Sequence, residues 1–166
     1  ALESLGYKAD LEAQMTPGKT NIMLECFTYD FVEAMKEVGK TPGTEFIIIA
    51  TEFSTGETFN DFSSADEEPA LDSHYDIPQY WKKRFRTFLI AQEQAQAIWH
   101  LAASQIEPFR KATGNPHVHY LPHGYVDGFA RVRHKTETHK DIDAIFTGTL
   151  TRHRHALIRQ LEQRGI

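Results

Sequence analysis

A run of consecutive apolar residues, Phe46–Ala50, constrains the fold of this chain more than any other feature. The run is rich in β-branched residues, contains no polar residue and follows the turn residues Pro42 and Gly43. A strand with one solvated face alternates apolar and polar residues, whereas an unbroken apolar run is typical of a strand covered on both faces. The run therefore predicts a central strand of a parallel sheet.

Other segments with strand and helix patterns alternate along the chain. We expect strands at 21–26, 44–51, 97–103, 117–121 and 142–146, with a weaker candidate at 7–11. We expect helices at 28–39, from 78 onward, at 104–114 and at 151–165. The helix after Pro78 carries an apolar stripe of Trp81, Phe85 and Phe88, and its residues Lys82, Lys83, Arg84 and Arg86 are expected to form a solvated face. This alternation predicts an α/β fold with a parallel sheet and helices on both faces.

Composition narrows the class of protein. The chain has 166 residues, a net charge of -5 and a pI of about 6.0, which argues against a general nucleic-acid-binding protein. Cys26 is the only cysteine, so no disulfide framework or cysteine-based zinc site is expected. With a single cysteine, a protein of the reducing cytoplasm is expected. No apolar run approaches the ~18 residues of a membrane span. Both ends have the look of cuts within a longer protein.

Polar residues follow several of the expected strands. Thr51 and Glu52 follow the central strand, Ser104 follows the next, and His123 follows the strand at 117–121. In open parallel sheets, ligands bind beyond the carboxyl ends of the strands, so we take Glu52 and His123 as candidate catalytic residues. The alternative for Glu52 is a local role, as a cap or an ion-pair partner.

The last helix begins with an unusual concentration of positive charge. Residues 152–155 are Arg-His-Arg-His, at the end of a helix where the dipole is positive and acidic residues are preferred. Gly148 allows a tight turn before that helix, and Thr151 can cap it. A strand, a glycine turn and a helix N-terminus with free N–H groups together form a phosphate-binding site. The alternative is a surface helix whose arginines are solvated.

The chain contains nine histidines, and His117 and His119 have the spacing of a pair on one face of a strand. Such a pair can support a metal ion, but no third ligand at recognisable spacing and no cysteine accompanies it. We therefore expect an interior or edge-strand histidine pair and no metal site. A histidine-dependent metal protein is kept as the third alternative.

Two segments together resemble a known family. His119-Tyr-Leu-Pro-His-Gly-Tyr125, followed by a polar linker and by Asp141-Ile-Asp-Ala-Ile-Phe-Thr-Gly-Thr-Leu-Thr-Arg-His-Arg154, is similar to the domain junction of glycosyltransferases with the GT-B fold. The similarity is greatest to the bacterial group related to spore-maturation and capsule-type enzymes. Those enzymes have an LP-x-G end to the first domain and a GSLT-x-R-R opening to the second. Here Thr149 replaces the serine, and His153 separates the two arginines.

The resemblance implies a Rossmann-like acceptor-side domain at 1–138, with its first strand missing, and the first strand and helix of a nucleotide-sugar-binding domain at 139–166. It implies that Gly148, Thr149, Arg152 and Arg154 approach the donor diphosphate, with no cofactor and no catalytic metal. The partners would be a nucleotide sugar and a saccharide or other acceptor, and the fragment alone would be inactive. The oligomeric state is not specified. The second hypothesis is a non-enzymatic α/β domain with a ligand-binding or regulatory role.

Overall fold

The computed structural model describes residues 6–60, 78–124, 148 and 152–165. They belong to two compact units. The first comprises Ala1–Asp61 and Trp81–Gly124 and contains the sheet, and the second comprises Phe62–Tyr80 and Tyr125–Ile166. Each unit is described by itself.

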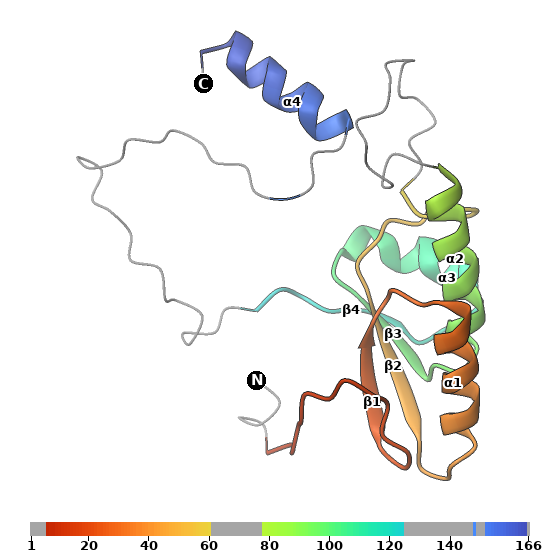
Figure 1. The fold of residues 1–166 in the computed structure, drawn as a ribbon. Helices are drawn as coiled ribbons and strands as arrows, with labels where there is room; N and C mark the ends of the chain where they lie inside the picture. Colours follow the sequence, from red (N-terminus) through yellow and green to blue (C-terminus); the bar gives the residue numbers. More distant parts are fainter. Residues whose placement is uncertain (1–5, 61–77, 125–147, 149–151, 166) are drawn as a thin grey trace. The chain divides into compact units, whose positions relative to one another are not determined.

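The first unit is built from alternating strands and helices (Figure 1). In chain order they are β1 (Thr20–Leu24), α1 (Tyr29–Gly39), β2 (Glu45–Ala50), α2 (Pro78–Gln92), β3 (Ala97–His100), the 3-10 helix η3 (Ala103–Gln105), α3 (Ile106–Thr113) and β4 (Val118–Tyr120). The unit boundary falls within α2, whose residues from Trp81 onward belong to this unit. The four strands pair in parallel in the order β1-β2-β3-β4. The predicted α/β class and parallel sheet are confirmed.

The helices of this unit lie on one side of the sheet. Each connection moves one strand further in the same direction, and right-handed crossovers then bring every connecting helix to the same face. Figure 1 shows α1, α2 and α3 together on that face. We expected helices on both faces of the sheet, and the described residues place helices on one of them.

The core lies between the sheet and these helices. The residues Phe46, Ile48 and Ala50 of β2 face the helices and are fully or almost fully buried. They pack with a set of buried helix side chains: Val32 and Met35 of α1, Trp81, Phe85 and Phe88 of α2, and Phe109 of α3. The predicted apolar stripe of α2 is thus confirmed as its buried face.

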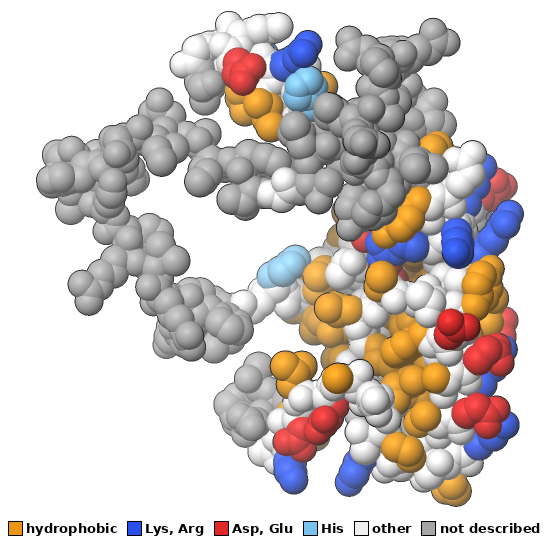
Figure 2. Space-filling model, viewed as in Figure 1, with side chains coloured by type: hydrophobic (Ala, Val, Ile, Leu, Met, Phe, Trp, Pro, Cys, Tyr) orange, Lys and Arg blue, Asp and Glu red, His pale blue; other side chains and the backbone are white. Residues whose placement is uncertain are grey.

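The opposite face of the sheet is apolar and only partly covered. The register places Ile22 beside Ile47 and Leu24 beside Ile49 on this face. Leu24 is 68% exposed and Ile22 is 38% exposed, whereas Ile47 and Ile49 are half-buried. Figure 2 shows hydrophobic side chains over the strand region, with charged side chains gathered along the outer side of the helices.

Local signals in the sequence set several element ends. Thr28 begins α1, because its Oγ1 accepts the backbone N–H of Phe31 at 3.2 Å. Gly114 ends α3 with a φ of 68°. Residues 7–11, all of which the structure describes, form no strand. The helix expected at 104–114 begins later, because Ala103–Gln105 form the 3-10 turn η3 and α3 begins only at Ile106.

In the second unit, the structure describes residues 78–80 at the start of α2, Gly148, and residues 152–165, which include the helix α4 (Arg152–Gln163). Gly165, with a φ of 79°, follows the helix as expected. The strand expected at 142–146, Thr149 and Thr151 lie outside the described residues. No helix in the described part of the chain has the length and apolarity that crossing a membrane requires.

Candidate functional site

Three neighbouring strands end in ionisable side chains at one edge of the sheet. Glu25 follows the last residue of β1, Glu52 lies two residues after β2, and His100 is the last residue of β3. Because the strands are parallel, their carboxyl ends meet at the same edge. Ligands of open α/β sheets bind at this edge, so these residues define the candidate site.

Glu25 is the most buried carboxylate of the group, with 1% of its side chain exposed. Its Oε2 accepts the backbone N–H groups of Thr51 at 2.9 Å and Glu52 at 3.0 Å. Its Oε1 accepts Nη2 of Arg84 at 2.6 Å. Burial raises the pKa of the Glu25 carboxyl, and these hydrogen bonds together with the Arg84 charge act in the opposite direction. Glu25 thus ties the end of β1 to the end of β2 and to α2.

Arg84 joins both carboxylates. Besides Oε1 of Glu25, its Nη2 donates to the Glu25 carbonyl oxygen at 2.8 Å, and its Nη1 lies 3.2 Å from Oε1 of Glu52. The guanidinium also lies 5.3 Å from the ring centroid of Trp81. The Arg84 side chain is only 14% exposed, so the prediction that it belongs to the solvated face of α2 is wrong.

The loop after β2 holds the other oxygen of Glu52. Nδ2 of Asn60 donates to Oε2 of Glu52 at 2.5 Å, while Oδ1 of Asn60 accepts the N–H of Phe53 at 3.1 Å. Asn60 adopts a φ of 46°, a left-handed conformation that asparagine tolerates better than most residues. Both carboxylate oxygens of Glu52 are therefore oriented by neighbours, with 23% of its side chain exposed.

His100 is the fourth member of the cluster and is completely buried. Its Nδ1 accepts the N–H of Ala102 at 2.9 Å, which places the proton of the neutral ring on Nε2. Nε2 then donates to the carbonyl oxygen of Glu52 at 3.0 Å. Burial lowers the pKa of His100, and the two backbone contacts only partly oppose that effect. His100 fixes the backbone that carries Glu52.

The lowered pKa of His100 predicts a pH dependence of stability. The unfolded chain binds a proton at His100 near the ordinary pKa of 6.5, whereas the folded protein does so only at lower pH. The stabilisation from the neutral ring is therefore present above pH 6.5 and is lost as the pH falls through the folded pKa. His100→Asn is expected to be less stable than wild type at pH 8, with a gap that narrows below pH 6.5.

Chemical denaturation of both proteins across this pH range measures the gap. Glu25 has a raised pKa, so its contribution to stability is present below pH 4.5 and is lost as the pH rises through the folded pKa. Glu25 is present in both proteins, so the difference in stability between wild type and His100→Asn cancels this contribution. A gap that stays constant from pH 8 to pH 5 would contradict the assignment of a buried neutral ring.

The residues proposed from the sequence have different locations. Glu52 lies in the cluster, whereas His123 is exposed beyond β4 and makes no hydrogen bond or ion pair with any other described residue. Gly148 has a φ of 127°, a conformation that favours glycine, and Arg154 is exposed on α4. Arg152 is the first residue of α4, and its side chain, like Thr149, lies outside what the structure describes.

Sequence reasoning missed Glu25, Arg84, Asn60 and His100. Glu25 directly follows the apolar strand β1, and His100 lies two residues after the buried Ile98, so both positions carried a usable signal. Nothing in the sequence near Arg84 indicated its role, because its partner Glu25 is 59 residues away along the chain. No group of three or more possible metal ligands occurs among the described residues.

Comparisons of the chain with protein-family models, with curated proteins and with solved structures return no match. The candidate site is therefore characterised by its own geometry: two carboxylates, one guanidinium and one neutral histidine at the carboxyl edge of a parallel sheet.

Proposed function

We propose that this chain is part of a glycosyltransferase that moves a sugar from a nucleotide-sugar donor to an acceptor. The first unit would serve the acceptor side, and α4 with the turn before it would serve the donor diphosphate. The similarity of residues 119–125 and 141–154 to the GT-B domain junction is the sequence argument for this proposal.

The start of α4 is the observation that carries the proposal. The helix begins at Arg152 and has no acidic residue in its first turn. Arg154 is exposed there, and Gly148 has a φ of 127° four residues before the helix. Cations in the first turn of a helix are disfavoured by the helix dipole and are favoured when an anion binds beside them. A diphosphate would supply that anion, and the leaving group could be stabilised without a metal.

The first unit supports an acceptor role through Glu52. Its carboxylate is held by Arg84 and Asn60 and keeps partial exposure at the edge where ligands of open sheets bind. A carboxylate with fixed orientation can accept a hydrogen bond from a hydroxyl group of an acceptor. In this proposal Arg84 and Asn60 position Glu52, and Glu25 positions Arg84.

Arg154→Ala is expected to weaken the binding of uridine diphosphate by the full-length protein by roughly 1.5–3 kcal/mol, the cost of a lost charge-assisted hydrogen bond. Calorimetric titration measures the affinity. Arg159→Ala is the matched control, because Arg159 is also exposed on α4 but lies beyond its first turn. Equal affinities of wild type and Arg154→Ala would remove the diphosphate assignment.

The second candidate function is a non-enzymatic α/β domain that binds a ligand. The ion pairs of Arg84 with Glu25 and with Glu52 favour it, because charged groups that pair with one another can hold a binding site in shape without taking part in a reaction. Titration of free sugars beside nucleoside diphosphates separates the two functions. A protein that binds sugars and no nucleoside diphosphate would be a binding module.

A further inference from the structure

Two exposed histidines lie at the edge strand β4: His117 directly precedes the strand, and His119 is its middle residue. His117 and His119 are two residues apart, so their side chains share a face of the strand. That face is the one opposite the helices, because the intervening Val118 is buried beside Ile98 on the helix face. The pair lies outside the cluster of Glu25, Glu52 and His100.

The backbone beneath the two rings is fixed by hydrogen bonds. The N–H of His117 donates to Oδ1 of Asn115 at 2.8 Å, and its carbonyl oxygen accepts the N–H of Ile98 at 3.0 Å. His119 is held by its pairing with Trp99 in the parallel register. Within the described residues, no ring nitrogen of His117 or of His119 makes a hydrogen bond or an ion pair. Hydrogen bonds thus fix the backbone of both histidines, and within the described residues their ring nitrogens are open to a ligand.

The separation of the rings suits a shared ion. Their centroids are 6.3 Å apart with an angle of 33° between the ring planes. With metal–nitrogen bonds of about 2.0–2.1 Å, two imidazoles around one ion have centroids about 5 Å apart. The His χ2 torsion is broad, so rotations of the side chains alone can close the remaining distance.

We propose that His117 and His119 form a two-histidine chelate for a divalent transition metal of the zinc and copper type. Imidazole nitrogen suits Zn²⁺, Ni²⁺ and Cu²⁺, whereas Mg²⁺ and Ca²⁺ require oxygen ligands. The protein supplies two ligands, and water or another exchangeable group occupies the other positions. The site is independent of the glycosyltransferase proposal.

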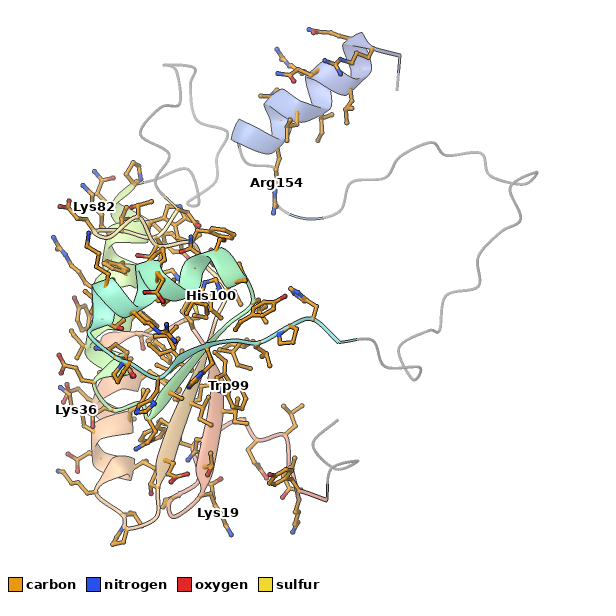
Figure 3. All side chains as sticks on the ribbon, turned by 180° about the vertical axis from the view of Figure 1, so that it is seen from behind. Lys19, Lys36, Lys82, Trp99, His100 and Arg154 are labelled. Atoms are coloured by element: carbon orange, nitrogen blue, oxygen red, sulfur yellow. The ribbon has the colours of Figure 1, made fainter. Side chains whose placement is uncertain are left out.

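The neighbouring tryptophan provides a direct readout. Trp99, which is labelled in Figure 3, pairs with His119 in the register and lies on the same face of the sheet. Trp81 is buried on α2. Cu²⁺ is paramagnetic and quenches the fluorescence of a nearby indole. A titration with Cu²⁺ is therefore expected to quench Trp99, and Trp99→Phe is expected to remove this quenching while calorimetry still detects the bound ion.

Calorimetric titration with Zn²⁺ tests the ligands. His117→Ala and His119→Ala are each expected to lower the affinity at least about tenfold, since even the loss of an outer-shell partner costs 10–100-fold. The matched control is His155→Ala on α4, which should bind as wild type does. Unchanged Zn²⁺ affinity in either strand variant, an equal loss in His155→Ala, or full Cu²⁺ quenching in Trp99→Phe would each overturn the proposal. Thermal unfolding without metal verifies that the variants are folded.

Discussion

Replacing Glu25 with alanine is expected to lower the free energy of unfolding by about 3–5 kcal/mol, the usual cost of removing one partner of a buried ion pair. The substitution removes the acceptor of Arg84 Nη2 at 2.6 Å and of the N–H groups of Thr51 and Glu52. Those donors lie in a part-buried region, where water replaces a lost partner poorly. Nη1 of Arg84 still lies 3.2 Å from Oε1 of Glu52 in the wild-type arrangement.

The control is a carboxylate with an exposed partner. Glu33 pairs with Lys36 at 2.7 Å on the surface of α1, and Glu33→Ala is expected to change stability by about 0.5 kcal/mol or less. Urea denaturation at neutral pH measures both variants. Glu25→Gln adds a second comparison, because its amide oxygen can still accept the N–H groups of Thr51 and Glu52 while its NH₂ group faces Arg84. We expect it to fall between wild type and Glu25→Ala, and equal losses at positions 25 and 33 would contradict a structural role for the buried pair.

Features governed by nearby residues could be predicted from the sequence. The unbroken run Phe46–Ala50 becomes a strand with parallel neighbours on both edges. Thr28 caps the start of α1 and Gly114 caps the end of α3, as expected. Such signals depend on local propensity and on the spacing of apolar residues, both of which are visible in a short window of sequence. The same reasoning fails at Ser104, because the chain forms a 3-10 turn before α3 begins.

The candidate site depends on contacts between distant residues, and the sequence could indicate only part of it. Glu52 was found because the carboxyl end of a central strand is a known ligand position. Arg84 belongs to a run of cations on an amphipathic helix, where a solvated position is the ordinary outcome. Its burial follows from Glu25, and only the folded sheet brings that carboxylate to α2. The donor-side residues of the second unit stay predictions.

Phe59→Ala is expected to cost about 3–5 kcal/mol of folding free energy through the loss of buried surface and the cavity it leaves. Phe59 is completely buried, and its ring centroid lies 5.0 Å from Phe85, 5.3 Å from Phe88 and 6.0 Å from Phe109. This ring joins the loop after β2 to the helices α2 and α3. The next residue is Asn60, so loss of the ring also frees the side chain that orients Glu52.

The loop offers a matched control in Phe53, which is 49% exposed and contacts the His100 ring only at its edge, with centroids 6.2 Å apart. Phe53→Ala removes the same number of atoms but leaves no closed cavity, so its cost is expected to be about 1 kcal/mol or less. Denaturation gives both values, and hydrogen exchange at the Asn60 amide, which donates to the Phe53 carbonyl oxygen at 2.8 Å, reports on the loop itself. Phe59→Ala should accelerate this exchange under conditions where the sheet stays protected. If the Asn60 amide and the sheet amides exchange through the same opening, the loop is part of the global folding unit, and a local anchoring role for Phe59 is excluded.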